Sequence, residues 1–303
     1  MSRVLVTPRS FTTGPVHPEL VRLQNAGHEL VFSAAGRVPT TAELAELVPD
    51  CVAWLAGVET IDRGTLERAR LLKIIARHGV GVDAVDLAAA EALGIPVVPS
   101  TGSNAEGVAE LVILHALGSR RRFANGLTID DADAWQRSRG SELQGRVAAV
   151  IGYGAIGSRV AHLLAAFDME IRVCDPFATV AAGLTVVGTV REAIAGADLI
   201  TLHCPPQGVA IIGEPELAVV AVGATLINTA RGALVDLDAA LAALESGQLG
   251  AYGCDAYTSE PPDPHPIWSH PNVMATPHIG GFTAESVQRS AAMAVDAIVN
   301  AIS

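Results

Sequence analysis

The feature that most constrains the fold is a glycine-rich turn within residues 147–157. An apolar run short enough to be one buried strand ends at Gly152, and Gly154 and Gly157 follow it. A strand, a glycine turn and a helix in this order bind a dinucleotide, because the glycines admit its pyrophosphate and the helix N-terminus faces the negative charge. The helix is predicted from apolar residues at helical spacing, which are Ile156, Val160, Leu163, Leu164 and Phe167.

A second strand and an acid strengthen this interpretation. The strand-like run 170–174 ends at Asp175, and an acid at this distance past the glycines accepts hydrogen bonds from the adenosine ribose. Its carboxylate would repel the 2′-phosphate of NADP, and Pro176-Phe177 supplies no arginine to bind that phosphate. The sequence therefore predicts NAD, held in the turn by Gly152, Gly154, Ala155, Ile156 and Gly157.

Composition bounds the class of protein. A chain of 303 residues exceeds one ordinary core and predicts two domains. The net charge of −12 argues against nucleic acid or an anionic membrane as a partner. The four cysteines form no CxxC pair and no apolar run is long enough to span a bilayer, so we expect a soluble cytoplasmic protein with buried thiols and no metal site.

Short apolar runs alternate with helical patterns along the chain, which indicates parallel sheets covered by helices on both faces. Five such runs precede residue 100, and six begin with the run at 147, the number in a complete dinucleotide-binding sheet. We therefore predict an α/β fold of two doubly wound parallel-sheet domains with a cleft between them. Residues 1–100 with 283–303 would form a flavodoxin-like substrate-binding domain, and residues 101–282 a Rossmann NAD-binding domain.

Polar clusters follow several of these strands. We expect Arg77 and His78 to contact the substrate together with the following Gly79-Val80-Gly81, whose consecutive N–H groups could bind a small anion. Because the carboxyl ends of parallel strands meet at the edge where ligands bind, we expect the later clusters to converge there and to supply hydride-transfer chemistry. Those clusters are Thr229-Ala230-Arg231, Asp255 with Glu260, and His278-Ile279-Gly280.

The helix predicted from Ala105 to Leu117 is apolar almost all round, so we expect it to be buried between domains or between subunits. Together with the segment around Trp135 it predicts a twofold partner, and therefore a homodimer. Arg137 or Arg139, next to Trp135, could reach the site from that partner subunit.

Taken together, these motifs resemble the D-2-hydroxyacid dehydrogenase family, close to its phosphoglycerate dehydrogenase-like branch, over nearly the whole chain. The resemblance implies an NAD-dependent oxidoreductase that acts on a CH–OH group. It implies a catalytic arginine at Arg231, an acid partner at Glu260, a proton-transferring histidine at His278, and Asp255 near the nicotinamide amide. It rests on the motifs 77–83, 228–232, 260–262 and 276–280 and on the glycine turn.

The chemistry of these side chains agrees with the implied roles. Arg231 presents a planar fork of donors that can bind a substrate carboxylate and polarise the C2 oxygen. A Glu260 carboxylate close to the imidazole favours its charged form, so that His278 can deliver a proton as the ketone accepts hydride. In the opposite direction His278 is the base.

The chain departs from the family pattern at three places. Cofactor contacts are also expected from His203-Cys204-Pro205 and from Gly280, but the family usually continues the first of these segments differently, as His-x-Pro-Leu-Thr. Ala155 stands where family members commonly have arginine or lysine. Ala56-Gly57 stands where many phosphoglycerate dehydrogenases have an Arg-Ser pair.

The substrate is predicted from the cations that remain. Arg9 follows the first strand and Arg77 the fourth, so both could face the same cleft as the backbone loop 79–81. Arginine suits bidentate binding of a phosphate or second carboxylate, which predicts a dianionic 2-hydroxy or 2-keto acid: 3-phosphoglycerate, or a phosphonate or dicarboxylate analogue. Structural ion pairs at Arg9 and Arg77 are the alternative. Alternatives for the whole protein are an NAD-sensing, corepressor-like binding protein and a formate- or phosphite-type dehydrogenase, although the formate branch typically pairs its histidine with glutamine, not with an acid such as Glu260.

Overall fold

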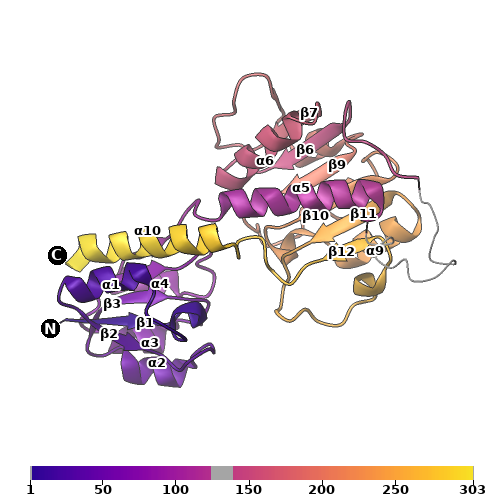
Figure 1. The fold of residues 1–303 in the computed structure, drawn as a ribbon. Helices are drawn as coiled ribbons and strands as arrows, with labels where there is room; N and C mark the ends of the chain where they lie inside the picture. The colour runs from indigo at the N-terminus through magenta and orange to yellow at the C-terminus, as the bar shows by residue number, and fades with distance from the viewer. Residues whose placement is uncertain (1, 124–138, 303) are drawn as a thin grey trace, which may run out of the picture. The chain divides into compact units, whose positions relative to one another are not determined.

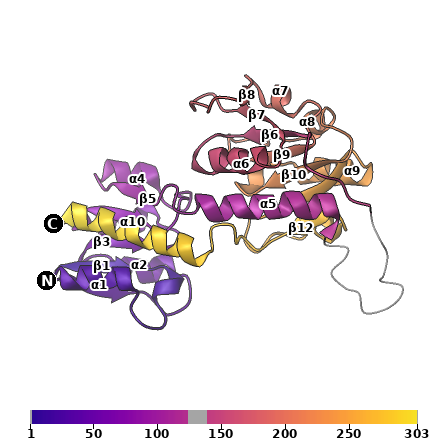
Figure 2. The same cartoon turned by 45° about the horizontal axis from the view of Figure 1, so that its top comes forward.

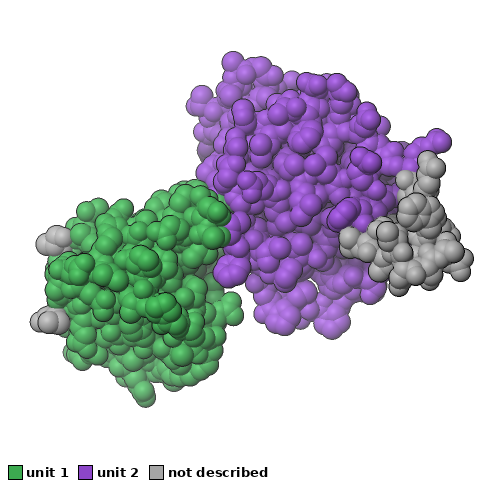
Figure 3. All heavy atoms as spheres, viewed as in Figure 1, with its two compact units in different colours: residues 1–104, 284–303 green, residues 105–283 purple. Residues whose placement is uncertain are grey.

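The computed structural model describes residues 2–123 and 139–302. The chain divides into two compact units, drawn in different colours in Figure 3. Unit 1 comprises residues 1–104 and 284–303, and unit 2 comprises residues 105–283. In the described ranges no helix has the length and apolar character needed to cross a membrane.

Unit 1 contains a five-stranded, all-parallel sheet in the order β2-β1-β3-β4-β5, which is the flavodoxin order. Its strands are β1 (Arg3–Val6), β2 (Glu29–Phe32), β3 (Cys51–Ala56), β4 (Ile74–Arg77) and β5 (Val97–Pro99). Its helices are α1 (Pro18–Asn25), α2 (Thr41–Leu47), α3 (Arg63–Arg68), α4 (Leu87–Ala92) and α10 (Ala284–Ile302), with a 3-10 turn η1 (Arg9–Phe11) after β1.

The two faces of this sheet are covered by different helices, because successive strand residues point to opposite sides. Val4 and Val6 belong to a core with α1 and α10, whereas Leu5 lies in a core with α2, α3 and α4. Both faces are therefore buried, which explains why the strands appear in the sequence as continuous apolar runs.

The C-terminal helix α10 packs against α1 and the sheet of unit 1, and Figures 1 and 2 both show α10 beside α1. Its buried face is formed by Ala291, Ala294, Val295 and Ile298, which recur at helical spacing. The Arg22 guanidinium of α1 lies 2.6 Å from the Asp296 carboxylate. The last helix of the chain therefore belongs to the unit formed by its first hundred residues.

Unit 2 contains a seven-stranded parallel sheet in the order β12-β11-β10-β9-β6-β7-β8. The strand order reverses between β6 and β9, as it does at the cofactor crevice of Rossmann sheets, and this confirms the predicted fold class. The strands are β6 (Val147–Ile151), β7 (Glu170–Cys174), β8 (Thr185–Val186), β9 (Leu199–Leu202), β10 (Ala224–Asn228), β11 (Leu249–Cys254) and β12 (Val273–Ala275).

The sequence predicts six strands here, and the seventh, β8, is the one it misses. This edge strand has only two residues, both exposed, so it carries no hydrophobic pattern. The helices of unit 2 are α5 (Ala105–Arg121), α6 (Ala155–Ala165), α7 (Val190–Ile194), α8 (Glu214–Leu217) and α9 (Leu237–Glu245), with 3-10 turns η3 (Gly232–Leu234) and η4 (Pro266–Ser269).

Helix α5 lies beside α6 over one face of the sheet, as Figures 1 and 2 show. Val108, Val112 and His115 of α5 are buried. Leu114 and Leu117 remain 51% and 38% exposed, so the expected burial on all sides is not reached within one chain. Of the residues expected at a subunit contact, Trp135 and Arg137 lie outside the described residues, and Arg139 is exposed.

Candidate active site

Two positions of the glycine turn in unit 2 have no room for a side chain. Gly152 has a φ of 92°, and a Cβ there would lie 2.6 Å from the carbonyl carbon and oxygen of His203. A Cβ on Gly157 would overlap the Gly152 carbonyl oxygen. No atom lies within 4 Å of the Cβ position of Gly154, which precedes the first residue of α6. The backbone at Gly154 is therefore open to close approach by a ligand at a helix N-terminus, as a pyrophosphate requires.

Asp175 follows the last residue of β7, beside this turn. Its Oδ2 accepts a hydrogen bond of 2.7 Å from the Tyr153 N–H, and its Oδ1 accepts from Phe177 and Ala178 at 2.8 and 3.1 Å. Partial burial favours the neutral acid, but these three N–H groups outweigh it and hold the pKa of Asp175 below its usual value. The group is an ionised acceptor, and Oδ2, which accepts from only one of the three N–H groups, has capacity for a further hydrogen bond from a ribose hydroxyl.

His203 supports the turn from inside unit 2. Its Nε2 lies 2.8 Å from Thr201 Oγ1, and its Cβ would contact a Cβ placed on Gly157 at 3.4 Å. Burial lowers the pKa of His203 to about 3, so the ring is neutral at physiological pH. Burial raises the pKa of the neighbouring Cys204 thiol, and Pro205 is exposed. Their predicted contacts with the cofactor stay predictions.

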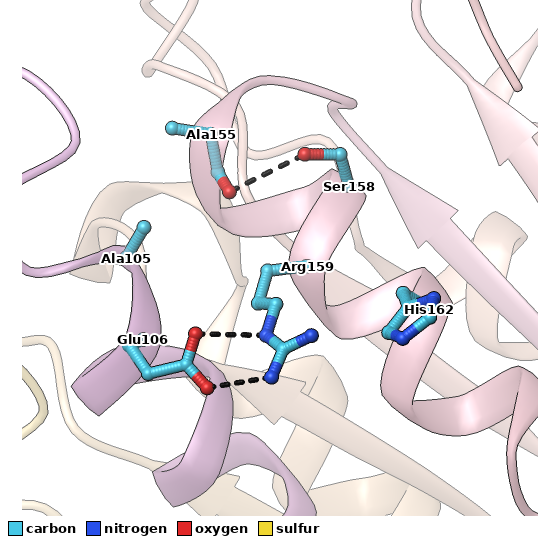
Figure 4. A pocket seen from close by; sticks show the side chains of 6 residues that line it. All are labelled: Ala105, Glu106, Ala155, Ser158, Arg159 and His162. Atoms are coloured by element: carbon cyan, nitrogen blue, oxygen red, sulfur yellow. Dashed lines mark hydrogen bonds and ion pairs between the residues drawn. The ribbon is translucent and has the colours of Figure 1, made fainter.

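Position 155 is an alanine and provides no positive charge, and the nearby Arg159 forms an ion pair with Glu106. Figure 4 shows Arg159 of α6 facing Glu106 of α5 in the pocket that Ala155 also lines. Arg159 Nε and Nη2 donate to the two Glu106 carboxylate oxygens at 2.8 and 2.7 Å. Because this fork ties α5 to α6, it does not replace the basic residue that the family commonly has at position 155.

The loop after β10 carries Thr229, Ala230 and Arg231, and Asn228 shapes it. The buried Asn228 accepts from the Ala230 N–H at 3.1 Å and donates to the Arg231 carbonyl at 2.8 Å. Within the described ranges the buried Thr229 Oγ1 has no hydrogen-bond partner, which suits a residue that contacts a ligand. Sequence reasoning assigned no role to Asn228, although a strand-ending asparagine is a common turn signal.

Gly232 brings this loop against the loop that follows β11. A Cβ on Gly232 would overlap the Tyr257 carbonyl carbon and the Thr258 nitrogen, so the two backbones are in direct contact. Arg231 is therefore adjacent to the segment that leads to Glu260. The three catalytic residues predicted from the sequence lie on loops at the same edge of one sheet.

His278 and Glu260 form the central pair of this edge. His278 Nδ1 is hydrogen-bonded to Glu260 Oε1, and both side chains are about half exposed. Among the described residues no partner is seen for His278 Nε2, so this is the nitrogen that can meet a substrate. The arrangement is that of a histidine oriented by a carboxylate for general acid–base catalysis.

Asp255 holds the backbone of the loop that carries His278. The side chain is 3% exposed. Its Oδ1 accepts from Thr276 Oγ1 at 2.6 Å and from the Ile279 N–H at 2.8 Å, and its Oδ2 accepts from the Gly280 N–H at 2.8 Å. Sequence reasoning missed this function, because it depends on three long-range hydrogen bonds. The expected contacts of Asp255 and Gly280 with the cofactor stay predictions.

Unit 1 contains the predicted anion-binding loop. The N–H groups of Gly79, Val80 and Gly81 donate to no other residue in the described part of the chain. Arg77 is 5% exposed and its Nε donates to the Gly81 carbonyl at 3.0 Å, while its buried Nη1 has no hydrogen-bond partner there. Arg77 therefore supports the loop from within through the Gly81 carbonyl.

His78 is engaged within unit 1. Its N–H donates to the Ala56 carbonyl at 2.8 Å, and its Nε2 lies 3.3 Å from the Val287 carbonyl oxygen of α10. Its ring also packs edge-on against Phe11, with 4.6 Å between centroids. Burial lowers the pKa of His78 to about 4, so the ring is neutral. Because the His78 ring already contacts Val287 and Phe11, it is a weaker candidate for binding the substrate than Gly79, Val80 and Gly81.

The segments after β1 and β3 lie side by side at the carboxyl edge of this sheet. A Cβ on Gly57 would lie 2.9 Å from the Pro8 Cα, which explains the missing side chain where many phosphoglycerate dehydrogenases have a serine. The buried Glu59 accepts from the Gly57 N–H at 2.9 Å and from the Thr7 hydroxyl. Arg9, one residue beyond Pro8, is exposed.

Comparison with known proteins agrees with this geometry. Residues 113–280 match the model for the NAD binding domain of D-isomer specific 2-hydroxyacid dehydrogenases. The D-3-phosphoglycerate dehydrogenase of Methanocaldococcus jannaschii is 33% identical over 298 residues, which are 95% of this chain and 56% of that protein. The D-3-phosphoglycerate dehydrogenase of Mycobacterium leprae is 35% identical over 260 residues, which are 83% of this chain and 49% of that protein.

A solved structure shares the whole fold. The crystal structure of a Thermus thermophilus protein superposes with a TM-score of 0.88 at 34% identity, covering 98% of this chain and 96% of that one. The chain spans about half the length of the curated relatives it matches. The family match takes in more than half of the sequence and the sheet order is that of a Rossmann domain, so the chain belongs to the D-isomer specific 2-hydroxyacid dehydrogenase family, with NAD as its cofactor.

Proposed function

We propose that this protein is an NAD-dependent dehydrogenase that interconverts a small anionic D-2-hydroxy acid and its 2-keto acid. The observation that carries the proposal is the His278–Glu260 hydrogen bond, which leaves His278 Nε2 available to a substrate. When bound, NAD accepts or supplies the hydride at its nicotinamide ring. The residues of this chain then bind and orient the acid and move its proton.

The proton is moved by His278. In the reductive direction the imidazolium gives its Nε2 proton to the C2 carbonyl oxygen, which becomes the hydroxyl as C2 accepts hydride. The neighbouring Glu260 carboxylate stabilises the imidazolium before transfer. In the oxidative direction the neutral ring removes the hydroxyl proton. This pair favours catalysis over a purely NAD-sensing role, in which no proton would need to move.

The carboxylate of the acid is proposed to bind two kinds of donor. The Arg231 guanidinium suits a planar carboxylate and can polarise the C2 oxygen. The N–H groups of Gly79, Val80 and Gly81 form a backbone anion site, and the Arg77 charge behind them supports anion binding. Unit 1 would thus contribute to substrate binding, while unit 2 binds NAD and supplies the proton-transfer pair.

We further propose a substrate with a second anionic group, most simply 3-phosphoglycerate. The phosphoglycerate dehydrogenase names of the similar proteins support this choice. The buried Arg77, which ends β4, and the exposed Arg9, which follows β1 of the same sheet, support it electrostatically. A cytoplasmic location is proposed on the four cysteines, which are all free thiols.

The His278→Ala variant is expected to lower kcat for keto-acid reduction by on the order of 100-fold or more, because general acid–base catalysis is lost. The Kd for NADH, measured by fluorescence titration, should stay near the wild-type value. His265→Ala is the control, since His265 is hydrogen-bonded to Asp238 and not to Glu260 or His278, and it should turn over normally. A near-normal kcat in His278→Ala would refute the assignment.

The cofactor preference tests Asp175. Wild-type kcat/KM should strongly favour NADH over NADPH, because the ionised carboxylate repels a 2′-phosphate. Asp175→Asn removes that charge and should reduce the preference by about tenfold, corresponding to roughly 1.4 kcal/mol. Asp168→Asn, a neutralisation outside the cofactor turn, should leave it unchanged. Equal kcat/KM for both cofactors in the wild type would contradict the ribose-binding role.

The substrate proposal is tested by a panel of keto acids with NADH: phosphohydroxypyruvate, oxaloacetate, pyruvate and an apolar branched keto acid. Arg9→Ala should raise KM selectively for the dianions. Arg77→Ala should raise KM for every acid, and most for dianions, because it also removes the support of Gly81. Arg68→Ala on α3 is the control. If pyruvate or the apolar acid is preferred and neither variant acts selectively on dianions, the dianion proposal fails.

We also propose a homodimer, supported by the exposed apolar residues Leu114 and Leu117 on α5. Light scattering at micromolar protein should give the mass of two chains. A Leu114→Glu/Leu117→Glu double variant should be monomeric, because two charges would be buried in the contact. Leu93→Glu, at an exposed leucine of unit 1, should stay dimeric. A monomeric wild type would contradict the proposal.

A further inference from the structure

One buried histidine has no part in the reaction described above. His115 of α5 is 0% exposed, and its Nδ1 has no hydrogen-bond partner in the described part of the chain. Its ring is close to β11: a Cβ on Gly253 would lie 2.9 Å from His115 Cγ and 3.0 Å from its Nδ1. The glycine at 253 therefore makes the space for this ring.

The other nitrogen of His115 reaches Thr276. Its Nε2 lies 3.5 Å from Thr276 Oγ1, which is itself 2.6 Å from Asp255 Oδ1. A hydroxyl has one hydrogen, and the short contact with a carboxylate takes it. Thr276 can then only accept from His115, so His115 carries its proton on Nε2. Burial lowers the pKa of His115, against the opposing charge of Asp255, and the ring is neutral.

Thr276, two residues before His278, is hydrogen-bonded through both its side chain and its carbonyl. Its carbonyl accepts from the Tyr257 hydroxyl at 2.7 Å and from the His278 N–H at 2.8 Å, while its side chain is held by Asp255. On the other side of His278, the N–H groups of Ile279 and Gly280 donate to the same Asp255 carboxylate.

His278 itself has a φ of 52°, in the left-handed region that costs a non-glycine residue energy. Such a conformation persists when the surrounding contacts determine it. The hydrogen bonds on both sides of His278 are therefore what holds its backbone in this conformation.

We propose that His115 and Thr276 are positioning residues for His278: the hydrogen-bond chain from His115 through Thr276 to Asp255 holds the loop so that the His278 ring meets Glu260 and the substrate. Neither residue contacts the reacting atoms. The proposal rests on the proposed function of His278 in proton transfer. A buried nitrogen without a hydrogen-bond partner is unfavourable, and a leucine at this position would avoid it. The positioning role explains why a histidine is found there.

The first test removes the hydroxyl. Thr276→Val should lower kcat by on the order of tenfold, since small displacements of a catalytic group have large effects on rate. The Kd for NADH and the thermal midpoint should change little, and Thr276→Ser should restore kcat. Thr225→Val, at a buried threonine of β10, is the control and should behave as wild type. A normal kcat in Thr276→Val, or a serine variant as slow as the valine variant, would overturn the proposal.

The second test is a double-mutant cycle. His115→Leu should lower kcat in the wild-type background, and His115→Gln, which keeps a side-chain N–H donor, should lower it less. If His115 acts through the Thr276 hydroxyl, His115→Leu should have almost no further effect in the Thr276→Val background. The same fold-loss in both backgrounds would show that His115 acts independently, and the hydrogen-bond chain would be refuted.

A third readout does not depend on turnover. Hydrogen exchange of the Ile279 and Gly280 amides should be faster in Thr276→Val and His115→Leu than in the wild type or Thr225→Val, because their acceptor is less well held. Unchanged exchange in both variants would refute the proposal even if kcat falls. If the wild type reduces no keto acid, the proposed function fails, and faster exchange in the two variants would still establish that they hold this loop.

Discussion

The parallel arrangement of the strands is the constraint on which the site depends. In each sheet all strands run the same way, so the segments that follow them meet at one edge. The glycine turn follows β6, Asp175 follows β7, and the catalytic candidates follow β10, β11 and β12. Residues that are more than one hundred positions apart in the chain are thus brought to one edge of unit 2.

Buried polar side chains then hold the connecting loops at that edge. Asn228 shapes the loop with Arg231, Asp255 holds the loop with His278, and Glu59 binds the backbone after β3 in unit 1. Each is almost fully buried and hydrogen-bonded to loop backbone, as a buried polar group must be if it is not to destabilise the fold. These loops are therefore rigidly placed although they have no regular secondary structure.

Close backbone contacts complete the arrangement. Gly157 lets α6 approach the Gly152 carbonyl, Gly232 lets the loop after β10 contact the loop after β11, and Gly253 makes space for the His115 ring. In each case the neighbouring atom is backbone or an enclosed ring, which cannot move aside for a side chain. The spacing between the layers is set by the absence of these side chains.

The local patterns of the sequence determined the fold class and the glycine turn, and the family resemblance pointed to His278 and Glu260 as the proposed proton-transfer pair. Apolar runs, glycine spacing and the acid after β7 act over a few residues, so they are visible without coordinates. Only the tertiary structure decided which polar groups are free. It showed that His78 is engaged with Ala56 and Val287, and that Arg77 is buried behind its loop.

The connection from His115 to Asp255 likewise became visible only in three dimensions. A histidine inside an apolar helix pattern and a threonine before a proline carry no signal of their own in one sequence. Their hydrogen bond joins residues 161 positions apart, and such a contact is set by how α5 packs on β11, not by any periodicity along the chain. Hydrophobic pattern determines which faces are buried, whereas the packing of those faces determines which polar atoms meet.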